Sequence, residues 1–185
     1  EIYDFMRLLF ARVSTAYSYV TNEEMVKYSD DQIVDLILDN YKGKKVIVLA
    51  PKIKGRKGHY RELFEQITKM GFTKVRVDGE LKEITKGMKL DRYKIHDVDI
   101  VIDRLEIGKK DKQRIYDDVV TAMKHGTKSM MIMDYETGDV RHFSRLLMCP
   151  TSGISYPEPE PNLFSFNSPY GACKTCSGLG EVTEV

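Results

Sequence analysis

Cysteine, long apolar runs and excess charge are all scarce in this sequence, and each absence argues against a class of protein. The 3 cysteines among 185 residues are an odd number, which fits poorly with a complete disulfide framework and favours a reducing, cytoplasmic environment. No stretch approaches about 18 consecutive apolar residues, so we expect neither a membrane-spanning helix nor a secretory signal. With a formal net charge of +1, any contact with nucleic acid needs a local basic patch.

A phosphate-binding loop is absent as well. No glycine-rich loop ends in Gly-Lys-Ser or Gly-Lys-Thr, and the nearest imitation, Gly-Arg-Lys-Gly at residues 55–58, lacks the required spacing. We therefore expect no ATP-binding site and no catalytic activity in these residues. Because the sequence opens at Glu1, in what reads as the middle of a helix, we also expect it to be a piece of a longer protein.

The composition is that of a folded domain, with 42% hydrophobic and 31% charged residues. Apolar residues at three- and four-residue spacing predict helices over residues 1–13, 29–41, 58–70 and 111–124. Apolar runs and alternating patterns predict strands over residues 46–50, 74–77, 80–82, 98–102, 129–134 and 140–143. The predicted fold class is α+β, with helices packed on a largely antiparallel sheet with hairpins, plus a small C-terminal degenerate zinc-knuckle appendage.

Short motifs predict where several of these elements begin and end. Ser29 and Gln32 have the spacing of a capping box, in which the serine hydroxyl and the glutamine amide satisfy free amide groups of the first helical turn. Pro51 is expected to end the first strand. Asp78 and Gly79 are the pair best suited to the positive φ angles of a two-residue hairpin turn.

The most specific chemical pattern lies near the C-terminal end, where two short motifs have the outline of a four-cysteine zinc site with one cysteine missing. Cys149 and Ser152 form one half, and Cys173 and Cys176 form the other. A serine hydroxyl stays protonated near neutral pH and binds zinc far more weakly than a thiolate does. The three cysteines are therefore candidate zinc ligands, with His142 or water available as a fourth ligand.

The same end of the chain resembles a known protein family. The segment PEPEPNLFSFNSPYGACKTCSGLG resembles the zinc module of UvrA, the damage-sensing ATPase of bacterial nucleotide excision repair. The resemblance continues in EIYDFMRLLFARV at 1–13, VLAPKIKGRKGHYRELFE at 48–65, VRVDGE at 75–80 and DVDIVIDRL at 97–105. It implies a helix and connector of the ATPase body at 1–23, a UvrB-binding domain at 24–145, and an extended Pro-rich linker with a Cys-x-x-Cys module at 146–185.

The function implied by this resemblance is recruitment rather than catalysis. The domain would dock UvrB, in a parent protein that dimerises, finds damaged duplex DNA and hydrolyses ATP elsewhere in its chain. Residues 52–61 carry five cationic side chains and no acid, which suits an anionic partner surface, although a solvated loop before a helix would look similar. The candidate contact residues are Arg56, Lys57, Tyr60, Arg76 and Asp78. His96 and Arg104 border the next strand; they would extend the same charged face if they contact the partner, but for both we expect structural roles.

Two other functions are compatible with the residues. The basic loop at 52–61 would contact DNA if the chain came from a UvrA paralogue whose UvrB docking is weakened or lost. Alternate residues of a strand share one face, and this spacing applies to Asp97, Asp99 and Asp103. Carboxylates arranged in this way can bind magnesium, as in a magnesium-dependent nuclease. No lysine, histidine or glutamate is placed by the sequence to complete such a nuclease site.

The chain also departs from the family pattern at its metal positions. Ser18 and Thr21 stand where UvrA relatives often carry a first Cys-x-x-Cys, and Ser152 replaces another expected cysteine. Two weakened zinc positions in one chain indicate a fold that does not depend on them.

Overall fold

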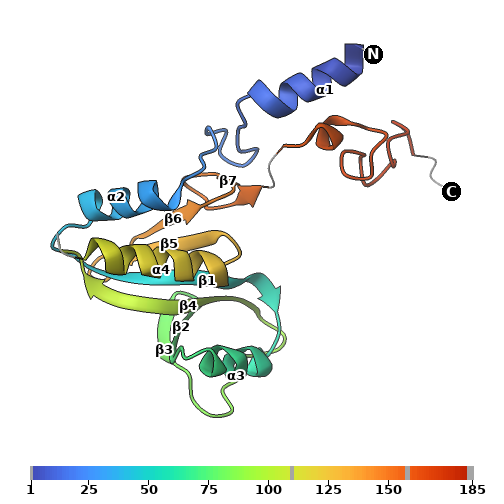
Figure 1. Cartoon of the computed structure of the whole chain (residues 1–185). Helices are drawn as coiled ribbons and strands as arrows, with labels where there is room; N and C mark the ends of the chain where they lie inside the picture. Colours follow the sequence, from blue (N-terminus) through green and yellow to red (C-terminus); the bar gives the residue numbers. More distant parts are fainter. Residues whose placement is uncertain (1, 109–110, 157–158, 183–185) are drawn as a thin grey trace.

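The computed structural model describes residues 2–108, 111–156 and 159–182 (Figure 1). Within these ranges the helices are α1 (Ile2–Val13), α2 (Asp30–Asn40), α3 (Arg61–Lys69), α4 (Lys112–His125) and the short 3-10 helix η1 (Pro161–Phe164). The strands are β1 (Lys45–Lys57), β2 (Lys74–Val77), β3 (Glu80–Glu83), β4 (Ile95–Glu106), β5 (Ser129–Asp134), β6 (Val140–Ser144), β7 (Leu147–Met148) and β8 (Ser155–Tyr156). None of the described helices is long and apolar enough to cross a membrane.

The centre of the fold is a six-stranded sheet with strand order β3-β2-β4-β1-β5-β6, and each neighbouring pair in it is antiparallel. Helix α4 packs across β1, β4 and β5, and α2 lies beside it (Figure 1). The main core cluster joins apolar side chains of these helices and of α3 to the inner face of the sheet. Fully buried aliphatic residues on β1 and β4, such as Val46 and Ile100, lie at its centre. The predicted α+β class is confirmed.

Several of the predicted boundaries are confirmed by the backbone. Ser29 caps α2 with both hydrogen bonds of a capping box: its hydroxyl accepts from the N–H of Gln32, and the Gln32 side chain accepts from the N–H of Ser29. Asp78 and Gly79 adopt φ angles of 53° and 90°, the left-handed conformation that a two-residue hairpin turn between β2 and β3 requires. Local chemistry was sufficient to predict both features.

The prediction that Pro51 ends the first strand is wrong, because β1 continues to Lys57. Strand β1 pairs with β5 only through Leu49, so beyond that residue one of its edges has no strand partner. Proline is tolerated on such an edge, because its missing N–H removes no ladder hydrogen bond there. Irregularities in the β1–β4 register on both sides of Pro51 accommodate the ring. The strand therefore carries Arg56 and Lys57 well beyond the helix-covered core.

Helix α1 and the C-terminal segment that contains η1 lie side by side, away from the sheet (Figure 1). Helix α1 buries none of its residues, and its apolar side chains are exposed along most of its length. Its contacts are with η1, where the Tyr3 hydroxyl donates to the Phe164 carbonyl over 2.7 Å and the rings of Phe10 and Phe164 lie 6.1 Å apart. The Cys173–Cys176 segment forms turns, and the predicted zinc-knuckle character of this appendage is not shown.

Candidate functional site: a charged face beside the ends of strands β1 and β4

The five residues predicted to contact a partner are brought to one region by the sheet. Arg56 and Lys57 end β1 and lie opposite His96 and Ile95 at the start of β4. The β2–β3 turn, which carries Asp78, lies beside the same start of β4, since the N–H of Asp78 donates to the Asp97 carbonyl over 3.0 Å. We call this region, formed by Arg56, Lys57, Tyr60, Arg76, Asp78 and His96, the charged face.

Tyr60 fixes the end of β1, which presents the two cationic side chains of Arg56 and Lys57. It adopts the left-handed conformation at the N-cap of α3, with a φ of 53°. Its hydroxyl donates to the carbonyls of Arg56 and Lys57 over 2.8 and 3.1 Å. At Gly58 a Cβ atom would lie 2.9 Å from the Tyr60 ring, so glycine is needed for this close approach. The basic end of β1 and its link to α3 are therefore held by specific contacts and are not a loosely solvated segment.

His96 lies at the centre of the charged face. Its Nδ1 lies 2.7 Å from the carboxylate of Asp78, and its Nε2 lies 2.9 Å from the carbonyl of Asp91. Since both ring nitrogens meet oxygen acceptors, only the doubly protonated ring can donate both hydrogen bonds. The hydrogen bond with Asp78 accordingly raises the pKa of His96, despite the burial of its ring.

Asp78 ties the hairpin turn to the neighbouring strand. Burial raises the pKa of its carboxyl, but hydrogen bonds from His96 and from the N–H of Asp97 outweigh this and lower the pKa overall. The Asp97 carboxylate in turn accepts a hydrogen bond of 2.6 Å from the N–H of Gly55. Three segments are thus joined through carboxylates: the β2–β3 turn, the start of β4 and the basic end of β1.

Arg76 lies in the same region but has a different partner. Its Nη1 lies 3.4 Å from the carboxylate of Asp99, which is 6% exposed. Burial raises the pKa of Asp99 to about 6, while the Arg76 guanidinium acts in the opposite direction. Among the described side chains, the Arg76 Nε is one of the few buried nitrogens or oxygens that lack a hydrogen-bond partner. Arg76 therefore retains capacity for a further acceptor.

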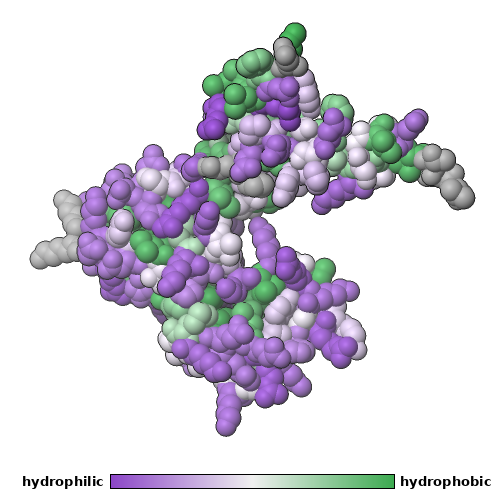
Figure 2. Space-filling view, turned by 45° about the vertical axis from the view of Figure 1, so that its right-hand side comes forward, coloured by the Kyte–Doolittle hydropathy of each residue, from purple (hydrophilic) through white to green (hydrophobic). Residues whose placement is uncertain are grey.

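Arg56 and Arg76 also line a cleft with a volume of about 780 Å³. Its other charged and polar lining side chains include Lys52, Lys54, Asp97, Asp99 and His142. In the space-filling view of Figure 2, a deep notch separates the part of the surface that carries α1 and the C-terminal segment from a mostly hydrophilic part below it. The charged face is thus adjacent to a concave and largely cationic surface.

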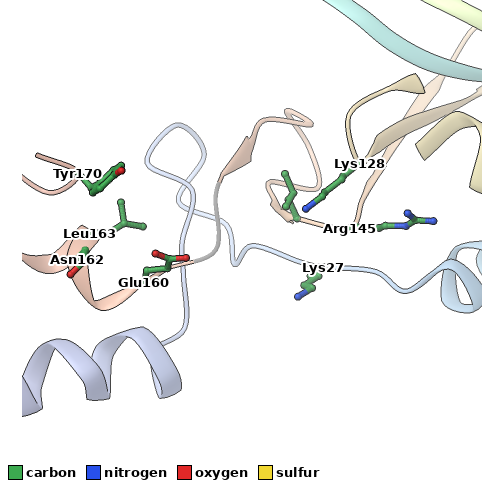
Figure 3. A pocket seen from close by; sticks show the side chains of 8 residues that line it. Lys27, Lys128, Arg145, Glu160, Asn162, Leu163 and Tyr170 are labelled. Carbon is green, nitrogen blue, oxygen red and sulfur yellow. The ribbon is translucent and has the colours of Figure 1, made fainter. Parts of the chain in front are cut away.

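A second hollow, with a volume of about 630 Å³, lies between the sheet domain and the C-terminal segment (Figure 3). Lys27, Lys128 and Arg145 lie on one side of it, and Glu160 and Tyr170 lie on the other. The guanidinium of Arg145 is held by both carboxylate oxygens of Asp30. None of the predicted contact residues lines this hollow.

The predicted zinc ligands are not assembled. Nowhere in the described residues do three His, Cys, Asp or Glu side chains gather closely enough to hold a metal ion. The Cys149 thiol is buried and contacts Thr21 and Glu23, whereas Cys173 is exposed. The ring of His142 lies against the backbone of Gly153. The zinc ligand set Cys149, Cys173 and Cys176 is a prediction from the sequence, and the described residues give it no support.

The nuclease hypothesis finds no support in the positions of the three aspartates. Asp97 binds a backbone N–H, Asp99 pairs with Arg76, and Asp103 pairs with Arg114 on α4. Arg104, the other residue that borders β4, stacks on the Tyr135 ring at 3.8 Å, near the opposite end of the strand from the charged face. Its expected structural role fits this contact. For His96 the sequence left open a structural role and a place in the charged face; its ring lies among the charged groups and joins two segments by hydrogen bonds.

Comparison with known proteins identifies the domain. Residues 29–136 match the family model described as the UvrA interaction domain. The whole chain aligns with UvrABC system protein A of Aquifex aeolicus at 40% identity over 185 residues and of Bacillus subtilis at 42% over 185 residues. The protein of the same name from Thermus thermophilus is 43% identical over 97% of this chain. The chain spans about a fifth of the length of these relatives, 20% in the Aquifex protein and 19% in the other two.

Proposed function

The chain belongs to the UvrA family, and from this premise we propose that its interaction domain docks UvrB during nucleotide excision repair. The observation that carries the proposal is the charged face, which lies inside the matched residues 29–136. Two of its cationic side chains, those of Arg56 and Lys57, project from the end of β1, which Tyr60 holds in place. Preformed presentation of this kind lowers the entropy cost of binding, and guanidinium groups bind carboxylates with two parallel hydrogen bonds.

In this proposal the domain recruits and does not catalyse. A dimer of the whole protein would find damaged duplex DNA, and the interaction domain would then bring UvrB to it. We place ATP binding and hydrolysis in parts of the whole protein outside these residues. The division into 1–23, 24–145 and 146–185 belongs to the proposal too; the matched residues 29–136 fall within its second part.

The test is calorimetric titration of this chain with UvrB from the same organism. Arg56→Glu and Arg76→Gln are the two informative variants. Glutamine is chosen at Arg76 because glutamate there would face the buried Asp99 carboxylate and disturb folding. We expect each variant to weaken binding by about thirtyfold or more, since loss of a paired charge at an interface costs about 2 kcal/mol or more.

Lys124→Glu on α4 is the matched control, because Lys124 is exposed and lies outside the charged face. Binding that survives both arginine changes, or that falls equally in the control, would refute the assignment of UvrB docking to the charged face. Absence of binding by the folded wild-type chain would refute the docking function itself.

A DNA-contacting role in a UvrA paralogue is the second candidate, and one observation favours it. Lys52, Lys54 and Arg56 line one side of a cleft, a pattern that suits a phosphate backbone. A chain that fails to bind UvrB but binds duplex DNA, with an affinity that falls steeply as salt rises, would support this second function.

A further inference from the structure

Two short turns face each other where the chain enters and leaves the sheet domain. One follows α1 and the other follows β7, and we call the region between them the neck. In the first turn the N–H of Thr21 donates to the Ser18 hydroxyl over 3.4 Å. In the second the N–H of Ser152 donates to the Cys149 thiol over 3.4 Å. The two turns therefore share one design, in which the side chain of the first residue accepts from the backbone of the fourth.

The side chains at these first and fourth positions meet. Thr21 Oγ1 lies 3.1 Å from Cys149 Sγ, and the thiol also lies 3.4 Å from a carboxylate oxygen of Glu23. The other carboxylate oxygen of Glu23 accepts a hydrogen bond of 2.8 Å from Thr151. Ser18 and Cys149 are 1% and 0% exposed. The cluster is buried at its centre and its polar groups have partners, as buried polar groups require.

Two facing turns of this kind are the scaffold of a four-cysteine zinc site, in which each turn supplies its first and fourth side chains. The donor set here does not fit zinc. One thiol and three hydroxyls occupy the four positions, and protonated hydroxyls are weak zinc ligands. The two weakened metal positions that the sequence shows separately, Ser18 with Thr21 and Cys149 with Ser152, are thus two halves of one place in the fold.

We propose that this cluster is a metal-free clasp. Hydrogen bonds of its hydroxyl, thiol and carboxylate groups join the two turns of the neck, at a place where four cysteines would bind a metal ion. Backbone bonds continue the closure beside the clasp, since the N–H of Val26 donates to the Met148 carbonyl over 2.8 Å and the N–H of Met148 donates to the Val26 carbonyl over 2.9 Å. Helix α1 and the C-terminal segment both lie on the far side of the neck (Figure 1). The clasp thereby fixes how the domain is attached to its flanking segments, without metal.

The first arm of the test uses the wild-type chain. After purification without chelator, we expect no stoichiometric zinc by metal analysis, and no change in thermal midpoint on addition of chelator or of zinc. Zinc retained in proportion to protein, with a lower midpoint after chelation and exchange protection lost at the neck, would overturn the proposal. This arm decides the metal-free claim whether or not any variant folds.

The second arm tests the scaffold by restoring thiols. The triple variant Ser18→Cys, Thr21→Cys and Ser152→Cys should bind one cobalt ion per chain, with the visible bands of a tetrahedral thiolate site. The matched control moves one thiol by a single position, with Thr151→Cys in place of Ser152→Cys, and should lose those bands. If the triple variant does not fold without metal, the double variant with Thr21→Cys and Ser152→Cys is titrated instead. Folded variants that bind no cobalt would refute the scaffold.

The third arm tests the clasp itself by hydrogen exchange. Thr21→Val removes the hydroxyl that meets the Cys149 thiol and keeps the shape of the side chain. We expect amide hydrogens at the neck to exchange about fivefold faster than in the wild type, while those of the sheet remain protected. Fivefold is about the factor that corresponds to loss of a hydrogen bond worth about 1 kcal/mol. Thr137→Val, which removes the hydroxyl that accepts from the N–H of Asp139 in the β5–β6 turn, is the control and should leave the neck unchanged. If amide exchange at the neck is the same in Thr21→Val as in the wild type, the proposed clasp is refuted.

Discussion

The ion pair between His96 and Asp78 yields the sharpest prediction, because the pair should weaken both at high pH, where His96 loses its proton, and at low pH, where Asp78 gains one. His96→Phe removes both ring nitrogens and keeps an aromatic ring beside Tyr60, while Asp78→Asn keeps a residue that tolerates the left-handed turn. A double-mutant cycle with these two changes isolates the interaction between the side chains. Hydrogen bonds that involve a charged group contribute about 1.5–3 kcal/mol.

The solvent exposure of the two side chains decides where in that range the coupling free energy of the pair should fall. The His96 side chain is 7% exposed but that of Asp78 is 45% exposed, so solvent screens the carboxylate side. We therefore expect a coupling free energy of about 1.5 kcal/mol near pH 5.5. The pKa of His96 is raised, so its contribution is complete below the unfolded value of about 6.5 and is lost as pH rises through the folded value. The pKa of Asp78 is lowered, so its contribution is lost as pH falls below about 4.

The assay is urea unfolding of the wild type, both single variants and the double variant, at about pH 5.5 and about pH 9. The coupling should shrink at the higher pH, because the neutral ring can no longer donate from both nitrogens to Asp78 and Asp91. His125→Phe is the control, since His125 packs on Phe72 and should show no coupling to Asp78 at either pH. A coupling that is equal at both pH values would refute the assignment of an imidazolium to His96.

Three further predictions follow from single contacts. Gly58→Ala should lower the free energy of unfolding by about 1–2 kcal/mol in urea titrations, because the added methyl would lie against the Tyr60 ring; an unchanged midpoint would contradict that contact. Burial raises the pKa of Asp99 to about 6, so the folded state binds the proton of this carboxyl more tightly than the unfolded state does. As pH rises from about 4 to about 6, the free energy of unfolding of the wild type should therefore fall by on the order of 2 kcal/mol relative to that of Asp99→Asn. Parallel curves of stability against pH for the two proteins would argue against the burial of Asp99 beside Arg76. Ser29→Ala should cost about 1 kcal/mol, measured by thermal unfolding, through loss of the capping box, and a loss below about 0.3 kcal/mol would count against the cap.

The elements of the fold were largely predictable because their signals are local. The capping box at Ser29, the Asp78-Gly79 turn and the apolar spacing of α4 each depend on a few neighbouring residues, and the structure confirms them. The exception was Pro51. Whether a proline interrupts a strand depends on which edges of that strand are paired, and the neighbours of β1 are β4 and β5, distant in the sequence.

The candidate site was predictable as a set of residue types but not as an arrangement. The resemblance to UvrA pointed to Arg56, Lys57 and Tyr60. The strand and turn pattern added Arg76 and Asp78, and the structure places all five in one region. For His96 the sequence left two roles open, a structural one and a place in the charged face. A histidine beside a strand carries no signal of its own, and its role depends on acceptors supplied by Asp78 and Asp91 from two other segments.

The metal positions show the same limit most clearly. Sequence spacing paired Cys149 with Cys173 and Cys176, since these form the nearest Cys-x-x-Cys pattern along the chain. In the structure the thiol of Cys149 meets Thr21, a residue 128 positions away.

The sequence by itself determined the α+β class, most helix and strand segments, the hairpin turn and the family, because these depend on local spacing and on blocks of residues that resemble the family. Only the tertiary structure decided that β1 runs past Pro51, that His96 joins the charged groups, and that the two weakened metal motifs form one clasp at the neck. The physical reason is the same in each case. Strand pairing and side-chain hydrogen bonds join residues that are far apart along the chain, and these partners exist only once the sheet has formed.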